Sequence, residues 1–358
     1  MPPRSGPRRL YRKHSTDYSL LGMHEEAAPP RRGEALDADA LARWLGAPVD
    51  IQQYPGGHSN LTYLIRVLEP QPAEALPVAM VLRRPPMGPV ASKAHDMARE
   101  YHLLQAVHPN FPLAPRPLRL CQEPAVLGCD FFLMELRPGR ILRNLAPPEG
   151  QRRPLSRAFV ETLAALHTVD AAQPDIAALG KPEGFLERQV TGWGGRWNKA
   201  ELEPVQDLRN TLAWLERNVP PRSGATLVHN DFKLDNLVLA EEAPTVTAVL
   251  DWEMATIGDP LFDLGVALTY WCHAPGLSRI TAEPGFWGRD EVIHSYSTLT
   301  GRDVSRLAWY EIFGVFKLAV IVQQIYFRWR QGQTSDARFS HFDEMVRELG
   351  ATAVRLLP

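Results

Sequence analysis

Two apolar stretches of the chain each end in polar residues that are suited to phosphoryl transfer. The polar residues are His229, Asp231, Lys233, Asn236 and Asp251. One carboxylate can accept the proton of an attacking hydroxyl, while an amide oxygen and a second carboxylate can hold Mg²⁺ against the phosphates of ATP. A lysine can neutralise the charge that develops during the transfer. These residue types predict the catalytic half of a nucleotide-dependent phosphotransferase.

Each of these residues has a separate predicted role. Asp231 is the predicted catalytic base, and Lys233 is predicted to meet the γ-phosphate, with a solvated lysine as the alternative. Asn236 and Asp251 are the predicted Mg²⁺ ligands, because magnesium takes one or two protein carboxylates and completes its shell with phosphate oxygens and water. His229 is counted with the catalytic group, but we expect it to brace the loop, since the place of the proton acceptor is already filled.

The spacing favours chemistry over a purely structural explanation. His, Asp and Asn are common in turns and caps, so a lone His-x-Asp pair would usually be structural. Here Asn236 lies five residues after Asp231, the offset of the protein-kinase catalytic loop, and Asp251 follows a second apolar run.

The pattern of hydrophobic residues predicts a small sheet lobe followed by a helical one. Strands are predicted at Val49–Tyr54, Leu61–Val67, Val78–Arg83, Leu118–Cys121 and Phe131–Leu136, with helices at Ala35–Leu45 and Ser92–Val107, the second capped by Ser92. After Pro138-Gly139 the predicted helices include Leu155–Val169, Asp207–Asn218 and Val304–Gln331, and strands are expected only around the catalytic stretch, at Thr226–His229, Leu237–Leu239 and Val246–Leu250. The predicted fold class is α+β. The chain is predicted to divide into a flexible basic lead-in (1–36), a nucleotide-binding lobe (37–136) and a catalytic and substrate-binding lobe (137–358).

Composition excludes several other classes of protein. The 358 residues are 45% hydrophobic and 22% charged, as in ordinary globular proteins, and the net charge of −2 argues against a nucleic-acid binder. Three cysteines without C-x-x-C spacing give no disulfide framework and favour a reducing compartment. The apolar run Ile312–Val322 is too short to span a bilayer and predicts a buried helix. We therefore expect a cytoplasmic protein without a nucleic-acid or membrane partner.

The first residues carry no secretory signal, because no apolar stretch follows the basic start. Prolines at positions 2, 3 and 7 favour a disordered tail over an amphipathic transit peptide. Met23 is an alternative start. The sequence does not indicate an oligomeric state.

Several segments together carry a family resemblance. They are Gly56-Gly-His-Ser-Asn-Leu-Thr-Tyr63, Val81-Leu-Arg-Arg-Pro-Pro86, Arg99-Glu-Tyr101, Phe132-Leu-Met-Glu-Leu136, Leu163-Ala-Ala-Leu-His167, the catalytic stretch, and the run from Leu250 to Leu264. With them the chain resembles the aminoglycoside phosphotransferase / choline kinase superfamily. It is most similar to the kinase-like domain fused to certain animal acyl-CoA dehydrogenases and to its stand-alone bacterial relatives. The resemblance implies a two-lobed protein-kinase-like fold, with a small N-terminal antiparallel sheet lobe and a larger, mainly helical C-terminal lobe. It also implies ATP and Mg²⁺ as cofactors.

The resemblance places a phosphate-covering loop between the first two strands. Its cofactor-binding residues would be Gly56, Gly57, Ser59 and Asn60. Backbone N–H groups and the serine hydroxyl could reach phosphate oxygens, and a plain hairpin turn is the alternative. Asp263 would support the catalytic loop from the following helix, and Asp259 could cap that helix.

The third strand departs from the family pattern, because it offers Arg83 where a phosphate-contacting lysine is usual. Arginine can still bridge a phosphate to Glu100 on the next helix, and Arg84 is the alternative if the alignment shifts by one. The connector between the lobes would present backbone groups to the adenine edge. Its residues are Met134, Glu135 and Leu136.

Three functions are compared. The favoured one is an ATP- and Mg²⁺-dependent phosphotransferase acting on the hydroxyl of a small molecule. A catalytically inactive ATP-binding pseudokinase is less favoured, since pseudokinases usually lack at least one of Asp231, Asn236 and Asp251. An acyl-CoA dehydrogenase activity, by association with the fused relatives, is rejected because the sequence offers no flavin site.

The acceptor is predicted from the charge and aromatic content of the second lobe. Tyr270–Pro358 contains ten Lys/Arg and nine Asp/Glu, a balance that disfavours a polycation, although an aminoglycoside or amino-alcohol kinase remains the alternative. Aromatic residues are plentiful there, and Lys317 and Arg328, eleven residues apart, can lie on one helix face. The predicted acceptor is therefore partly apolar and anionic, such as a hydroxy acid or hydroxyacyl thioester, as the fused relatives also imply.

Overall fold

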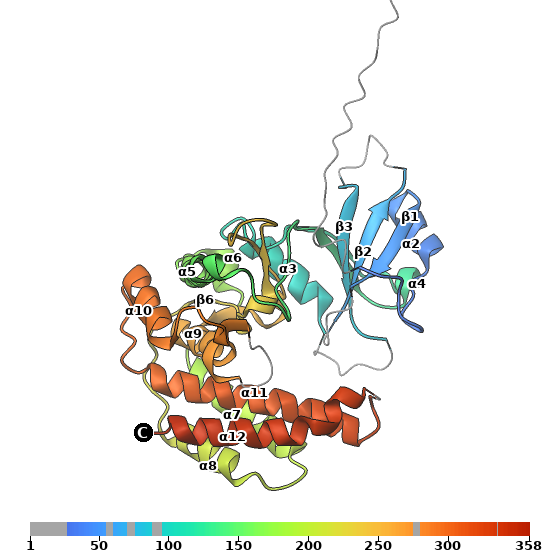
Figure 1. Ribbon diagram of the computed structural model, residues 1–358. Helices are drawn as coiled ribbons and strands as arrows, with labels where there is room; N and C mark the ends of the chain where they lie inside the picture. The colour runs from blue at the N-terminus through green and yellow to red at the C-terminus, as the bar shows by residue number, and fades with distance from the viewer. Residues whose placement is uncertain (1–26, 55–59, 70–75, 88–94, 275–279, 335) are drawn as a thin grey trace, which may run out of the picture.

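The computed structural model describes residues 27–54, 60–69, 76–87, 95–274, 280–334 and 336–358. Figure 1 shows a sheet with its flanking helices joined to a larger set of helices that ends in the pair α11 and α12. The two lobes have the kinase-like arrangement that the sequence predicts.

The small lobe is one antiparallel sheet in the order β1-β2-β3-β5-β4. Its strands are β1 (Val49–Gln53), β2 (Leu61–Val67), β3 (Ala79–Arg84), β4 (Pro117–Cys121) and β5 (Phe131–Glu135), with a one-turn helix α4 (Pro124–Leu127) between the last two. Alternate side chains of the strands enter two different cores. One core lies under α2 (Ala38–Leu45), while the other contains α3 (Met97–Val107) and continues into the helical lobe.

One prediction in this lobe is wrong in detail. Helix α3 begins at Met97 rather than near Ser92, because Asp96 caps it by accepting a hydrogen bond from the Arg99 N–H at 2.8 Å. Ser92 lies outside the described residues. Residues 1–26 of the predicted lead-in 1–36 lie outside them as well, and Ala28 forms an isolated β-bridge with Gln53 at the end of β1.

The large lobe consists mainly of helices. They are α5 (Glu149–Leu166), α6 (Pro174–Ala177), α7 (Phe185–Ala200), α8 (Gln206–Arg217), α9 (Pro260–Leu268), α10 (Arg289–Thr300), α11 (Leu307–Arg330) and α12 (Phe342–Leu356). Two short antiparallel pairs carry the catalytic segments: β6 (Thr226–Val228) with β9 (Thr256–Gly258), and β7 (Leu237–Leu239) with β8 (Val246–Val249). Strand β9 was not predicted, because three residues that end in glycine give little strand signal.

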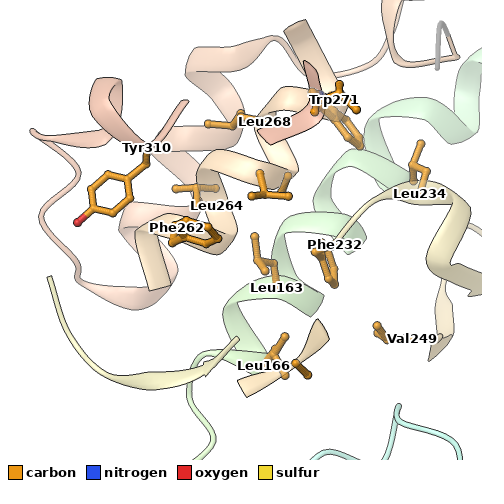
Figure 2. Packing of buried hydrophobic residues seen from close by; sticks show 14 of the residues in the cluster. Leu163, Leu166, Phe232, Leu234, Val249, Phe262, Leu264, Leu268, Trp271 and Tyr310 are labelled. Carbon is orange, nitrogen blue, oxygen red and sulfur yellow. The ribbon is translucent and has the colours of Figure 1, made fainter. Parts of the chain in front are cut away.

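Figure 2 shows the apolar core beneath these strands, where α5 and α9 face the catalytic segment. Phe232 packs on Phe159 of α5 with ring centroids 4.9 Å apart. Helix α11 forms the far side of this core and is long and apolar enough, by length and composition, to cross a membrane. However, 78% of its most apolar window is buried within the protein, so it is the buried core helix that the sequence predicts.

Helices α9 and α11 approach closely at two glycines. A Cβ atom placed on Gly314 would lie 2.3 Å from Thr269 Oγ1, and one on Gly265 would lie 2.6 Å from the Tyr310 backbone. Both distances are far below van der Waals contact. The spacing between these two helices therefore requires glycine at both positions.

Candidate active site

The catalytic loop runs from the end of β6 to the start of β7. Within it Phe232 and Leu234 are buried, and Figure 2 shows both among the side chains of the core. The intervening Asp231 and Lys233 are less buried, with side chains 15% and 23% exposed. This alternation anchors the loop by its apolar residues and leaves its charged ones at the surface of the site.

Asp263 of α9 holds the turn at the start of this loop. Asn230 has a left-handed backbone (φ 64°), which is uncommon for a residue other than glycine. The Asp263 carboxylate accepts hydrogen bonds from the N–H groups of His229 at 2.6 Å and Asn230 at 2.8 Å, and it contacts His167 Nε2 at 3.2 Å. Burial alone would raise the pKa of Asp263, but the hydrogen bond and charge of His167 lower it below its usual value. The aspartate therefore stays ionised and holds two backbone amides in place.

His229 braces the loop, as the sequence analysis expects. Its Nε2 lies 2.9 Å from the Leu250 carbonyl, which can only accept, so Nδ1 is the nitrogen left to accept from the Asp231 N–H at 3.3 Å. The imidazole thus joins the catalytic loop to the strand that leads into Asp251.

Asp231, Lys233 and Asn236 meet in one cluster. Lys233 Nζ lies 2.8 Å from Asp231 Oδ2, and Asn236 Nδ2 donates to the same oxygen at 3.0 Å and to the Asp231 carbonyl at 2.8 Å. Burial would raise the pKa of Asp231, but Lys233 and Lys317 lower it below its usual value. Burial would likewise lower the pKa of Lys233, but Asp231 raises it. Both groups are charged at neutral pH, and Asp231 can accept a proton.

Arg83, rather than Arg84, reaches the second carboxylate segment. Arg83 Nε lies 3.2 Å from Glu100 Oε1, and its NH2 lies 3.1 Å from Asp251 Oδ1. The guanidinium of Arg84 instead faces the carbonyls of Pro85 and Leu127. The third strand therefore delivers its first arginine to the site, and the carboxylate of α3 holds that arginine as expected.

Three carboxylates lie around Arg83. Besides Glu100 and Asp251, Glu253 Oε2 lies 3.8 Å from the same guanidinium. Burial raises the pKa of Glu100 to about 7, and Arg83 counters that rise. Asp251 itself has a left-handed backbone (φ 67°), which turns it out of the strand end.

The predicted magnesium ligands fit a hard divalent cation. Asn236 points its Nδ2 at Asp231, so Oδ1 is the atom left for a metal. The carboxylate of Asp251 is the second predicted oxygen donor, and Mg²⁺ is usually bound by one or two protein carboxylates together with phosphate oxygens and water. Among the described residues no group of three or more His, Cys, Asp or Glu is arranged to hold a metal ion.

Of the four residues predicted to cover the phosphates, Asn60 is among those that the structure describes. Gly56, Gly57 and Ser59 lie outside the described residues. Asn60, at the start of β2, donates from Nδ2 to Glu253 Oε2 at 2.7 Å and contacts His95 through Oδ1 at 2.8 Å, so it ties the sheet to the segment after Asp251.

The predicted connector begins within β5. Met134 and Glu135 belong to that strand, and Leu136 follows it. The Glu135 N–H already donates to the Arg116 carbonyl at 2.8 Å. Beyond the connector, Arg140 pairs with Leu239 of β7, which joins the segment that follows the connector to the catalytic segment.

A pocket of about 590 Å³ opens beside Lys233. Much of its wall is the apolar face of α11, formed by Leu318, Ile321, Val322 and Ile325. The other lining residues are Arg31, Phe159, Lys233, Leu234, Asp235, Ala267, Tyr270, Trp271, Thr281, Arg328, Gln333, Thr334, Asp336, Arg338, Phe339 and Phe342. The pocket is thus apolar inside and carries arginines contributed by three separate segments.

Tyr270 links this pocket to the catalytic cluster. Its ring lies 5.0 Å from Lys233 Nζ, a cation–π distance. Burial raises the pKa of its hydroxyl, and the nearby carboxylate of Asp231 raises it further. Tyr270 belongs to a π-helical turn, Thr269–His273, which continues α9. Tyr270 is one of many aromatic residues in this part of the chain, and a π turn gives no sequence signal that would distinguish it.

The two cations expected to meet an acceptor occupy different places. Arg328 lines the pocket, whereas the side chain of Lys317 is almost fully buried and bonds to the carbonyl of Asn230. Eleven residues do bring both to one face of α11, but they lie about 16 Å apart along the axis. One small molecule would therefore meet Arg328 and not Lys317.

Fold and site together define a kinase-like phosphotransferase. The model of the phosphotransferase enzyme family (APH) matches residues 50–297, and the chain belongs to this family. Among solved structures, a candidate aminoglycoside phosphotransferase from Ralstonia eutropha is 27% identical, with a TM-score of 0.74 over 90% of this chain and 98% of its own. The aminoglycoside phosphotransferase APH(4)-Ia, solved with AMP-PNP and hygromycin B, is 18% identical and shares the fold (TM-score 0.56, 87% and 97% covered).

Curated relatives are longer proteins. Acyl-CoA dehydrogenase family member 10 of Mus musculus is 30% identical over 91% of this chain, and family member 11 of Gallus gallus is 31% identical over 91%. The chain spans only 31% and 44% of their respective lengths. It is therefore similar to one part of each protein, which agrees with the fused kinase-like domain named by the sequence resemblance.

Proposed function

We propose that this enzyme transfers the γ-phosphoryl group of ATP to the hydroxyl of a small, partly apolar and anionic acceptor. The observation that carries the proposal is the cluster of Asp231, Lys233 and Asn236 facing Arg83 and Asp251. Neighbours of the same fold, solved with AMP-PNP or ADP, support a nucleotide as the donor.

Each residue of the site has a separate role in the proposed transfer. The acceptor hydroxyl gives its proton to Asp231 as its oxygen bonds to the γ-phosphorus, and the bond from phosphorus to the bridging oxygen breaks to release ADP. Lys233 would balance charge on the transferred group, and Arg83 would hold the remaining phosphates. Asn236 and Asp251 would hold Mg²⁺, which supplies charge neutralisation at the phosphates when bound.

The shape and charge of the pocket support the class of acceptor. Its apolar wall on α11 suits a hydrocarbon segment, and Arg328 suits a carboxylate or phosphate. A hydroxy acid or a hydroxyacyl thioester has both features. An aminoglycoside would require a surplus of carboxylates to replace its lost hydration, whereas Asp235 and Asp336 are the two carboxylates among the lining residues. An aminoglycoside kinase nevertheless remains the second candidate, because the solved neighbours include enzymes of that kind.

The test is an ADP-release screen over hydroxy acids, hydroxyacyl-CoAs, aminoglycosides, choline and sugars. Asp231→Asn should reduce turnover of the best acceptor by about 10²–10⁴-fold and retain nucleotide binding, because the amide keeps the shape but cannot take a proton. Wild-type activity in that variant would refute the assigned base. A much larger kcat/KM for an aminoglycoside than for any hydroxy acid would overturn the acceptor class.

Magnesium is tested separately by thermal stabilisation. ATP should raise the melting temperature of the wild type only when Mg²⁺ is present, and Asp251→Ala should remove that dependence. Equal Mg²⁺-dependent stabilisation in the variant would contradict the proposed ligand.

A further inference from the structure

Lys317 is a buried cation on the otherwise largely apolar helix α11. It lies in the middle of α11, and the residue is only 3% exposed. Its Nζ lies 5.4 Å from the ring centroid of Trp193 and 5.9 Å from that of Phe262. Burying an ammonium group is costly unless the group is paired and hydrogen-bonded. A leucine at this position would be enough to fill the space. Packing therefore does not explain the lysine, and the contacts of its ammonium group must.

Those contacts are with the catalytic loop. Lys317 Nζ donates to the carbonyl oxygen of Asn230, which begins the peptide bond to Asp231. The N–H at the other end of that peptide, on Asp231, donates to His229 Nδ1 at 3.3 Å. The peptide next to the catalytic carboxylate is therefore held at both ends, and Lys317 supplies one of the two contacts.

The rest of Asn230 is also fixed. Its N–H donates to Asp263, and its side-chain Nδ2 donates to the Met254 carbonyl at 2.9 Å. Its backbone is in the left-handed region, which is unfavourable for a residue other than glycine. A turn of this kind persists only when its surroundings hold it, and among the described residues Lys317 supplies the hydrogen bond from α11.

A direct contact with the acceptor does not explain this lysine. It is absent from the lining of the pocket, and its ammonium is already bonded to a backbone carbonyl. The charged groups that act on it are Asp231 and Asp263, which attract it, and Lys233 and Arg196, which repel it.

We propose that Lys317 is a positioning residue for phosphoryl transfer, which orients Asp231 by holding the Asn230 carbonyl from α11. The inference rests on the proposed function for its catalytic consequence. Its structural consequence, the ordering of the loop, can be measured without any acceptor.

The test compares Lys317→Met with Gln323→Met. Gln323 is a matched control because it is buried on the same helix and donates to a backbone carbonyl, Ala200 O at 2.8 Å, far from the catalytic loop. Hydrogen exchange of residues 229–232 should accelerate about tenfold or more in Lys317→Met and stay near the wild-type rate in Gln323→Met, as expected for loss of a charge-assisted hydrogen bond at that loop. Equal exchange at the loop in the two variants would overturn the proposal, whatever the turnover.

Turnover provides the second readout. With an acceptor that the wild type uses, Lys317→Met should lower kcat about tenfold or more and leave KM for ATP within about twofold, since a displaced catalytic group slows chemistry more than nucleotide binding. Lys317→Arg, which keeps a charged donor, should recover part of the loss, and unchanged kcat in Lys317→Met would refute the proposal. If Lys317→Met does not fold, Lys317→Gln replaces it in both assays, because its amide is too short to reach the same carbonyl. A wild type without turnover for any acceptor would defeat the proposed function and leave the exchange experiment to decide this one.

Discussion

The catalytic loop and the acceptor pocket lie side by side but are built differently. In the loop, backbone groups of His229, Asn230 and Asp231 are fixed by Asp263 of α9, by Lys317 of α11 and by the imidazole of His229 itself. Much of the pocket wall is one face of α11, and side chains from several other segments, three arginines among them, complete the lining. Two of those arginines pair with neighbours: Arg31 with Glu34, and Arg338 with Asp336. Under the proposed function, we expect chemistry to depend on the buried hydrogen bonds of the loop, and acceptor choice to depend on Arg328 and on the side chains of α11 that face the pocket.

The contrast between loop and pocket would be wrong if the enzyme kept its activity after loss of Asp263, the carboxylate that accepts two backbone N–H groups of the loop. Asp263→Asn places an NH₂ group where two backbone N–H groups need acceptors, so the free energy of unfolding should fall by about 3–5 kcal/mol. Turnover should fall about a hundredfold, the order expected when a catalytic group is displaced. Urea unfolding and steady-state kinetics measure the two effects.

Asp259→Asn is the control for that variant. Asp259 is also buried and caps α9, but it bonds to Ser223, Leu261 and Tyr310 rather than to the loop. It should lose comparable stability with a much smaller loss of kcat. Equal losses of kcat in both variants would show that the loop responds to general destabilisation only.

The buried ammonium group of Lys317 should make the free energy of unfolding depend on pH. This dependence tests the loop region separately from the pocket. Burial lowers the pKa of Lys317 to about 8 from its usual 10.5, while Asp231 and Asp263 counter that fall. Below pH 8 the lysine is protonated in both states, and the folded protein carries the full cost of the charge. Between about pH 8 and 10.5 the unfolded chain binds more protons, so this group makes folding more favourable as the pH rises, by on the order of 3 kcal/mol in total.

The contribution of Lys317 is measured as the difference in free energy of unfolding between the wild type and Lys317→Met. Urea unfolding at pH 7 and pH 10 should show the wild type gaining stability relative to the variant at the higher pH. A difference that stays constant would mean that the buried lysine has an ordinary pKa, and one that moves toward the variant would mean that folding raises this pKa; either result would contradict the prediction.

The smallest expected effect is at the rim of the pocket. Arg328→Gln should raise KM for an anionic acceptor about 5–10-fold, roughly 1 kcal/mol, without changing kcat, because an exposed charge contributes modestly to binding. Arg330→Gln is the control, since Arg330 contacts Tyr326 and is not among the residues that line the pocket. A lower kcat in Arg328→Gln, or equal KM in both variants, would show that the rim does not select the acceptor.

The difference between the catalytic loop and the pocket also explains which features could be predicted from the sequence. The catalytic cluster is encoded within 25 residues, and its short strands place Asp231, Asn236 and Asp251 with little freedom. The lysine that supports the loop lies 87 residues from Asn230, in an apolar run whose pattern indicates only a buried helix. The pocket combines α11 with Arg31 from the lead-in, a contact that depends on long-range packing. Local periodicity also missed β9 and placed the start of α3 several residues early, because short strands and caps carry weak signals.

The contact of α9 with α11 through Gly265 and Gly314 has an evolutionary consequence. Helix α9 carries Asp263, while α11 carries Lys317 and the apolar wall of the pocket. A single added methyl group at either glycine would push the two helices apart and move the wall and the loop relative to each other. New acceptors can therefore arise by exchanging side chains along the wall, whereas a shift of the wall itself would cost activity toward every acceptor at once. Natural diversification of this enzyme should accordingly leave both glycines unchanged while the residues that face the pocket vary.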